Sequence, residues 1–373
     1  MIDHVVRRGL EHASTLDFIK RAAQDGPKIE IPGWGVFLLV TTVFVITVFL
    51  CLVDYSLKDV VATLAMVETP SAAITVSSTQ AEAGSKSVKE GLLETGPTIT
   101  LVHQKPITSG IRGTLRHLVS LAGAWARVRG VLCFYLYNVA FAFIHNILTH
   151  ILPRFPGQPI VVAAMAGAAL ANLHAAWTFK VISMPTDQWF HKRMPRMEGW
   201  KVLAFPAAVA TAMPYISLYI VQGFGILFGL HRLNQVDVTQ FSGAEWAWLI
   251  TRFVVMFVIV FACSIFICLP AMVTQIRVEA SILPDDQDTI VPFDRTFNGK
   301  VVAKILGGTG CIGFLDAWRS FNWEARVRLI KVYVKAFFIV TGLFVVLAHV
   351  LAFEAWAIMG PAFSKALQGH RVQ

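Results

Sequence analysis

The sequence predicts an all-α fold: a polytopic membrane helix bundle with about six transmembrane helices and additional amphipathic helices at the membrane interface. Of the residues, 55% are hydrophobic and only 15% are charged, and the mean hydropathy is +0.62. Soluble domains have about 45–50% apolar and about 25% charged residues. The chain also contains six long apolar stretches, and a helix needs about 20 residues to cross about 30 Å of hydrocarbon.

The N-terminal half of the prediction contains one span and a long loop. Residues 1–33 form an amphipathic segment in which apolar side chains can line a short interfacial helix. The first transmembrane helix is predicted at 34–57, around the uncharged stretch from Trp34 to Val53. Residues 58–130 are predicted to be a flexible loop, because 70–111 are rich in Ser, Thr, Gly and Ala. Within that loop, Leu115 to Arg129 pair an apolar face with arginines, which predicts a basic helix lying on the membrane surface.

Residues 131–272 are predicted to form a four-helix transmembrane core. The proline-rich turn at 153–159 favours an antiparallel hairpin between the first two of these helices, and prolines 206 and 214 predict a kink or tilt in the next. The small residues Ala163, Gly167 and Ala171 recur every four positions, which predicts close helix packing within the bundle; Gly225 and Gly229 offer a second such contact. The four predicted spans are Val131–Leu152, Ile160–Phe179, Val202–Leu230 and Trp246–Met272.

The C-terminal part is predicted to hold one more loop and one more span. Residues 273–331 are predicted to be a structured cytosolic loop whose last part, Asp316 to Lys331, interleaves aromatic and basic side chains as interfacial helices do. The sixth transmembrane helix is predicted at 332–360, and residues 361–373 form a tail.

Basic residues distribute unevenly between the two sides of these spans. The loops at 54–130, 180–201 and 273–331 contain 21 Lys and Arg residues, whereas the other loops and both ends contain 9. The positive-inside rule therefore places the three large loops in the cytosol and both termini across the membrane. The basic N-terminal segment does not fit this placement, because its basic residues would have to be translocated. The net charge of +9 arises from residues beside the spans, so anionic lipid headgroups are the expected partner and nucleic acid is not.

One motif resembles a dinucleotide-binding turn. Gly308-Thr-Gly310-Cys-Ile-Gly313 follows a short apolar stretch and matches the pattern GxGxxG. A dinucleotide-binding half needs repeated βαβ units, and the short segment between Gly313 and the sixth span cannot supply them. The expected structure is a glycine-rich turn before an interfacial helix.

Polar side chains inside the predicted spans are the candidate functional residues. Ionisable and amide groups in a span are costly and are by default functional, although interhelical hydrogen bonding is the more common role. If they converge, they form a proton or solute path, or two histidines on facing helices hold a haem. No cofactor is expected otherwise, and no metal site or disulfide framework is indicated. The candidate cluster is His145, His174, His349, Asn138, Asn172 and Glu354.

A resemblance to a known family covers most of the chain after residue 130. The stretch Val278 to Lys300, Asp316-Ala-Trp, Arg326-Val-Arg-Leu and Asn172-Leu-His-Ala-Ala-Trp177 resemble an uncharacterised fungal family of multi-pass membrane proteins. Its members often carry the label "ubiquitin carrier protein". A ubiquitin-conjugating domain needs a catalytic cysteine downstream of His-Pro-Asn, and this tripeptide is absent here. The resemblance thus implies a membrane location and a fungal source, and it implies no reaction.

These features predict a non-enzymatic membrane protein that organises the membrane, acts as an adaptor or is associated with transport. Its cytosolic loops are expected to contact lipid headgroups or a protein partner. The alternative is a transporter or a haem-binding redox protein that uses the intramembrane cluster. A role in the ubiquitin pathway is the third possibility, and it depends on the family label alone.

Overall fold

The structure is a computed structural model that describes residues 33–69, 72–77, 98–103, 105–185, 197–235, 241–284, 286–302, 307 and 310–360. The predicted N-terminal segment before Gly33 and the tail after residue 360 lie outside these residues. The chain divides into two compact units, and the larger one is Tyr55–Ala336. The smaller unit combines the chain before Tyr55 with the chain from Phe337 onward.

The described residues are almost entirely helical, which confirms the all-α fold. Five helical stretches are long and apolar enough to cross a membrane, or six if one bent pair counts as a single span. The bent pair is α7 (Gln158–Ala169) and α8 (Ala171–Ile182), which meet at an angle of 63°. These lengths are consistent with a multi-pass integral membrane protein. The five stretches are Gly33–Val67, Ala124–Ile151, Gly199–Leu227, Gly243–Ser281 and Trp323–Met359.

The first helix is longer than the predicted span. Helix α3 (Gly33–Asp54) continues without interruption into the π-helical segment η1 (Tyr55–Val61) and then α4 (Ala62–Val67). The predicted flexible loop from residue 58 therefore begins in a helix. No Gly or Pro interrupts the chain between Asp54 and Val67, and α4 is buried along its whole length, so burial favours the helix.

The fifth helix also continues past its predicted end. Helix α10 (Gly243–Cys263), the π-helical segment η7 (Ser264–Cys268) and α11 (Leu269–Ser281) form one helical stretch. Pro270 lacks an N–H for the carbonyl of Phe266, which explains the wider turn before it. Eight residues beyond the predicted boundary, including Val273, Ile276 and Val278, are buried, so the helix extends into the predicted loop.

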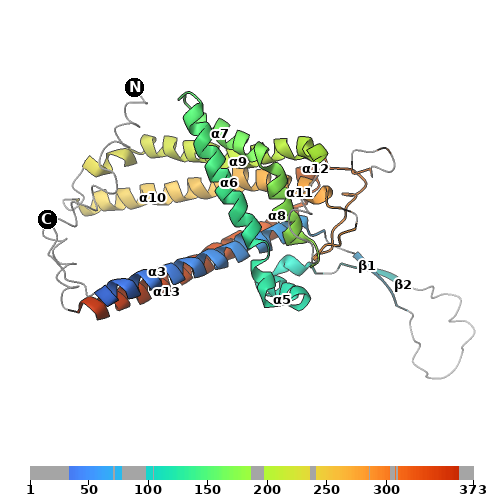
Figure 1. The fold of residues 1–373 in the computed structure, drawn as a ribbon, viewed down its shortest axis with the longest axis horizontal. Helices are drawn as coiled ribbons and strands as arrows, with labels where there is room; N and C mark the ends of the chain where they lie inside the picture. The colour runs from blue at the N-terminus through green and yellow to red at the C-terminus, as the bar shows by residue number, and fades with distance from the viewer. Residues whose placement is uncertain are drawn as a thin grey trace, which may run out of the picture. The chain divides into compact units, whose positions relative to one another are not determined.

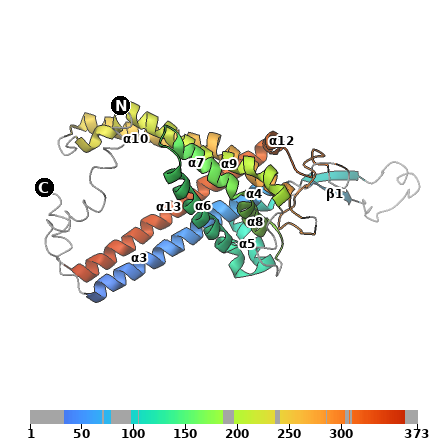
Figure 2. The same cartoon turned by 45° about the horizontal axis from the view of Figure 1, so that its top comes forward.

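The last span begins earlier than predicted. A short helix α12 (Phe314–Arg319) is followed by α13 (Trp323–Met359), which runs unbroken through the predicted boundary at residue 332. The basic-aromatic segment predicted as a separate interfacial helix is thus divided between α12 and the first turns of α13. In the smaller unit, α3 lies alongside the end of α13, where the Thr42 hydroxyl donates to Glu354 Oε1 at 3.0 Å (Figure 1 and Figure 2).

The predicted flexible linker contains a β-hairpin. Strands β1 (Ala72–Ser77) and β2 (Thr98–His103) pair antiparallel, with Ile74 opposite Leu101. Both strands are rich in Thr, Val and Ile, whose branched side chains favour extended backbone, and this local preference was not visible in the overall composition. Residues 78–97 between them lie outside the described part of the chain.

The predicted basic amphipathic helix is present in two pieces. After the 3₁₀ turn η2 (Ile107–Ser109), helix α5 (Ile111–Ala122) ends before Gly123, whose φ is +75°. The 3₁₀ segment η3 (Ala124–Val128) then leads to α6 (Val131–Ile151). Leu118 and Thr114 are fully buried, so α5 is packed onto the larger unit by this face.

The predicted small residues Ala163 and Gly167 of α7 form a tight contact with α9 (Met197–Leu227). The hydroxyl of Thr211 on α9 donates to the Ala163 carbonyl at 2.9 Å. A Cβ on Gly167 would lie 2.2 Å from Thr211 Oγ1 and 2.9 Å from the Ala207 carbonyl oxygen. The second predicted contact differs, because a Cβ on Gly225 would meet its nearest neighbour only at 4.0 Å.

A buried arginine joins three elements of the larger unit. Arg277 on α11 donates to the carbonyl oxygens of Ala317 and Met66 and to Ser320 Oγ, each at 3.0 Å. Its guanidinium also lies over the rings of Phe297 and Phe321. These contacts attach α4, α12 and the loop at 286–302 to α11.

The same loop is ordered by a carboxylate. Partial burial acts against the charged form of Asp294, but its oxygens accept hydrogen bonds from the hydroxyl and backbone of Thr296 and from the Asn298 backbone. These bonds and the charge of Arg277 lower the pKa of Asp294 below its usual value.

We expect Gly167→Ala to destabilise the protein, because the new methyl group would overlap Thr211 and overpacking costs about 1–3 kcal/mol. Gly223→Ala on α9 is the control, since a Cβ there meets nothing within 4 Å and alanine favours a helix. The measurement is unfolding of both variants in detergent, followed by circular dichroism. Equal stability of the two variants would contradict the tight contact.

Candidate functional site

A partly open cavity of about 350 Å³ lies in the larger unit. Five helical regions contribute to its wall: η1 with α4, α6, α8, α9, and η7 with α11. We call it the polar cavity, because charged, amide, hydroxyl and imidazole groups line it beside aromatic rings. These polar side chains are Lys58, Asp59, Thr63, Tyr137, Asn138, His174, Thr211, Tyr215 and Gln275.

Irregular helices shape this wall. Lys58 and Asp59 lie in the π-helical segment η1, and π-turns inside α-helices occur often at functional sites. His174 lies in the first turn of α8, directly after the 63° bend that separates α8 from α7. In a membrane, backbone that departs from a regular helix is tolerated where it is buried in protein or lines a cavity.

Helix α9 contributes a second irregularity. Pro214 has no N–H, so it cannot donate to the carbonyl of Ala210 one turn earlier, and both residues line the polar cavity. The hydroxyl of Thr211 is held by the carbonyls of Ala163 and Ala207, each at 2.9 Å. The face of α9 toward the cavity therefore combines a proline, a hydroxyl fixed in place and the ring of Tyr215.

A buried carboxylate supports one side of the cavity. Glu279 on α11 is 1% exposed and lies behind His174 and Gln275, which line the wall. Its Oε1 is 2.7 Å from His174 Nδ1 and 3.0 Å from Gln275 Nε2, and the Thr178 hydroxyl donates to Oε2 at 2.5 Å. Because Nδ1 of His174 is bound to this carboxylate, the orientation of the imidazole is fixed. We call these four residues the Glu279 network.

Aromatic rings fix His174 from two other directions. The rings of Tyr137 and Trp177 meet it edge-on, with centroids 5.0 and 5.1 Å away. Trp177 Nε1 donates to the hydroxyl of Tyr55 at 3.0 Å, and this hydroxyl donates to the Arg129 carbonyl at 2.5 Å. Trp177 and His174 are thus positioned by polar contacts as well as by packing.

The six predicted residues have different surroundings. His174 and Asn138 both line the polar cavity, and Asn138 also donates to the Phe134 carbonyl at 2.8 Å. The ring of His145 stacks on Tyr215 with centroids 5.5 Å apart, and its Nε2 makes no hydrogen bond within the described part of the chain. Asn172 is buried in α8.

The other two predicted residues belong to the smaller unit. His349 Nδ1 is 2.7 Å from the Val345 carbonyl oxygen of its own helix, and Glu354 accepts from Thr42. In the larger unit, the structure brings together His174 and Asn138, with His145 on the neighbouring Tyr215. Ligation of a haem by paired histidines stays a prediction. No group of three or more His, Cys, Asp or Glu side chains that could hold a metal ion occurs among the described residues.

Sequence reasoning missed three charged residues and one amide at this site. It placed Lys58, Asp59, Gln275 and Glu279 in loops, because the predicted spans ended at residues 57 and 272. A signal was present: no Gly or Pro lies between Ala271 and Ser281, and Gln275 and Glu279 are four residues apart, on one face of a continued helix.

The glycine motif is described only in part. Gly307 and residues 310–313 have defined positions, and Gly313 immediately precedes the short helix α12. The neighbouring residues 303–306, 308 and 309 lie outside the described residues. Cys311 and Gly313 lie beside Phe205 of α9 in a small surface pocket of about 230 Å³.

Comparison with known proteins does not assign this site. No family model matches the chain, and no curated protein or solved structure is significantly similar to it. The chemistry of the polar cavity must therefore be argued from its own residues.

We expect Glu279→Gln to destabilise the protein by about 1–3 kcal/mol, because an amide nitrogen would face groups that now donate to a carboxylate oxygen. Asp316→Asn is the control, since Asp316 is half-exposed and pairs with Lys300 at the surface, where ion pairs contribute about 0–1 kcal/mol. Unfolding of both variants in a denaturing detergent titration measures the difference. If the Glu279→Gln variant were as stable as the control, the Glu279 network would not contribute to the stability of the fold.

Proposed function

We propose that this chain is a multi-pass integral membrane protein that binds a small polar solute in the polar cavity, as a transport-associated component. The observation that carries the proposal is the cavity itself, lined by groups of both charge signs within a bundle of apolar helices.

The outer surface of the helices supports the membrane location. Large apolar side chains point away from the protein along several helices, among them Phe143, Phe257 and Phe261, which are 66%, 57% and 45% exposed. Soluble proteins rarely expose such contiguous apolar surface, whereas lipid tails solvate it. The three basic loops are proposed to face the cytosol, in line with the positive-inside rule.

The contrast between this surface and the interior supports solute binding. Charged and amide groups inside a membrane bundle cost free energy and are retained where they serve a ligand path or a relay. A volume of about 350 Å³ lies near the lower end of the range of about 300–1,000 Å³ typical of ligand pockets. It therefore favours a small molecule over a nucleotide or a lipid.

The irregular helices at the polar cavity also support solute binding. Membrane transporters build their substrate sites from discontinuous helices. Here the bend between α7 and α8, the π-helical segments η1 and η7, and Pro214 all lie at the polar cavity. The lining combines hydrogen-bonding groups with an imidazole whose orientation is fixed, which suits the binding of a polar solute.

Cys268 provides a native probe of the cavity, because it lines the wall and contacts Ser217 Oγ at 3.3 Å. We expect a charged, membrane-impermeant thiol reagent to modify a variant that keeps only Cys268. A variant that keeps only Cys263 is the matched control, since Cys263 precedes η7, is 7% exposed and does not line the cavity.

The same labelling reaction identifies the solute. A panel of amino acids, carboxylates, polyamines and sugars is added before the reagent, and a bound solute slows modification of Cys268. His174→Ala should remove this protection, because the imidazole is fixed at the wall. If Cys268 reacts no faster than Cys263, the cavity is closed to water and the proposal fails.

A further inference from the structure

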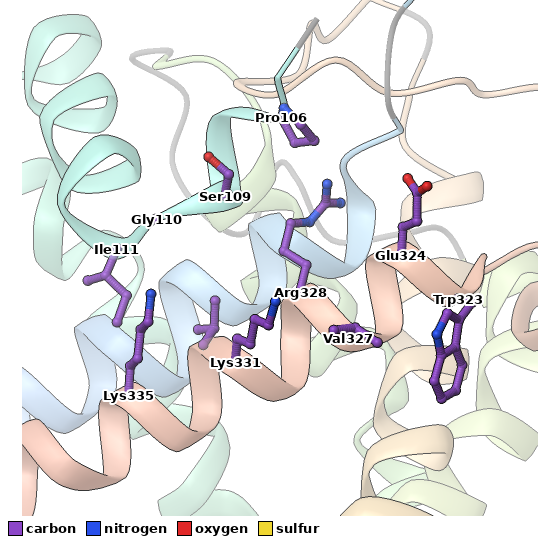
Figure 3. A pocket seen from close by; sticks show the side chains of 11 residues that line it. Pro106, Ser109, Gly110, Ile111, Trp323, Glu324, Val327, Arg328, Lys331 and Lys335 are labelled. Atoms are coloured by element: carbon purple, nitrogen blue, oxygen red, sulfur yellow. The ribbon is translucent and has the colours of Figure 1, made fainter. Parts of the chain in front are cut away.

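A second pocket, of about 400 Å³, lies at another place in the larger unit. One side is formed by the segment that joins η2 to α5, with Pro106, Ser109, Gly110 and Ile111. The other side is formed by the first turns of α13 (Figure 3). We call it the basic pocket, because Arg328, Lys331 and Lys335 of α13 line it.

The three basic residues share one face of α13. They are three and four residues apart, which places them above one another on a helix. In Figure 3 the side chains of Arg328 and Lys335 extend from α13 toward the segment that holds Ser109 and Ile111. Positive charge is thus concentrated on the wall that faces α5.

Arg328 is buried but incompletely bonded. Its side chain is 10% exposed, and Nη2 lies 3.8 Å from Glu68 Oε2 and 3.4 Å from the Glu68 carbonyl oxygen. Its Nε makes no hydrogen bond to any described residue. A buried guanidinium donor without an acceptor is costly, so an additional acceptor near Arg328 would be stabilising.

Glu68 satisfies Arg328 only in part, because its carboxylate also accepts hydrogen bonds from η2. The backbone N–H groups of Ile107 and Thr108 donate to it at 2.5 and 3.1 Å, and the Thr108 hydroxyl donates to the same oxygen as the Thr108 backbone. These bonds hold η2 against α4. Arg328 also lines the basic pocket, so a ligand phosphate there would share the guanidinium with Glu68.

The opposite wall adds donors suited to a phosphate. Helix α5 has twelve residues, and Gly110 at its N-cap provides no side-chain cap. The N–H groups in the first turn of a helix lack intrahelical acceptors and carry a partial positive charge. Together with the hydroxyl of Ser109 they resemble the anion sites found at helix N-termini.

The net charge of the basic pocket indicates the charge of its ligand. Glu324 also lines the pocket and Glu68 lies beside it, so two carboxylates partly offset the three cations. The remaining charge suits a singly charged phosphodiester better than a diphosphate or a nucleotide.

The place of the pocket along α13 identifies the source of that phosphodiester. Lys335 is followed directly by an uncharged apolar run from Ala336 to Phe353. A helix that enters the bilayer with this run holds its last basic residues at the level of the headgroups. Trp323, which is 71% exposed and lines the pocket, fits the same layer.

We propose that the basic pocket binds the headgroup phosphate of one anionic glycerophospholipid, held by Arg328, Lys331 and Lys335 and by the N-terminus of α5. The inference depends on the membrane location proposed above. It is independent of solute binding in the polar cavity, which involves other residues.

The test measures binding of short-chain phosphatidylglycerol, phosphatidylcholine and inorganic phosphate to the full chain in neutral detergent. Titrations are run at about 0.15 M and about 1 M salt, because the Debye length falls from about 8 Å to about 3 Å and diffuse surface attraction is screened. We expect phosphatidylglycerol to bind at both salt concentrations, and the other two compounds to bind much more weakly.

The variant Lys331→Gln/Lys335→Gln should weaken phosphatidylglycerol binding by about tenfold or more, since each basic residue near an anionic headgroup contributes about fivefold. Both lysines are exposed, so the fold should be unaffected. The control Arg116→Gln/Lys300→Gln removes the same charge at exposed positions outside the pocket and should retain binding at about 1 M salt. Arg328→Lys keeps the charge beside Glu68 but removes the planar guanidinium fork, and it should also bind more weakly.

Three results would overturn the inference. Wild-type binding that disappears at high salt would indicate diffuse attraction. An equal loss in the control variant would show that the pocket residues have no special role. Inorganic phosphate that binds as tightly as phosphatidylglycerol would exclude a lipid as the specific ligand.

Discussion

The Glu279 carboxylate is the constraint on which the larger unit depends. It is almost completely buried and accepts hydrogen bonds from α8 and from its own helix. A buried carboxyl group is tolerated only if its hydrogen-bond partners stay in place, so α8 and α11 must keep their mutual register. The position of His174 at the wall of the polar cavity follows from that register.

Two arginines also hold α8 and α11 in place. Arg129 donates to the carbonyls of Lys180 and Ser183 at the end of α8, where basic side chains stabilise a helix C-terminus. Arg277, two residues before Glu279, fastens α11 to α4 and α12. The polar groups of the larger unit are therefore concentrated around α8 and α11, while the outward faces of α6, α9 and α10 are apolar.

The two proposed ligands correspond to this distribution of polar groups. The polar cavity presents both charge signs and a fixed imidazole in the interior, which suits a small polar solute. The basic pocket presents an excess of positive charge beside the start of an apolar run, which suits a lipid phosphate. Helix α4 lies close to both sites, because Thr63 lines the polar cavity and Glu68, directly after the helix, lies beside Arg328.

Sequence patterns predicted the helical class and the approximate spans, since hydropathy over about 20 residues is a local property. They also predicted that Ala163 and Gly167 pack closely, and they grouped His174 and Asn138 in one candidate polar cluster, whose function stays a prediction. These patterns failed where polar residues lie within helices. Lys58, Gln275 and Glu279 are polar and were placed in loops, although each lies in a helix that is stabilised by burial of its other faces.

The sequence by itself therefore determined the class of this protein: apolar segments of spanning length require helices, and glycines and alanines at four-residue spacing require close contacts. Only the tertiary structure decided which polar groups meet. His174 lies 2.7 Å from Glu279 across 105 residues of sequence, and the segment of Ser109 lies opposite Arg328 in the basic pocket. Such pairs depend on how helices pack against one another, which the local spacing of residues does not specify.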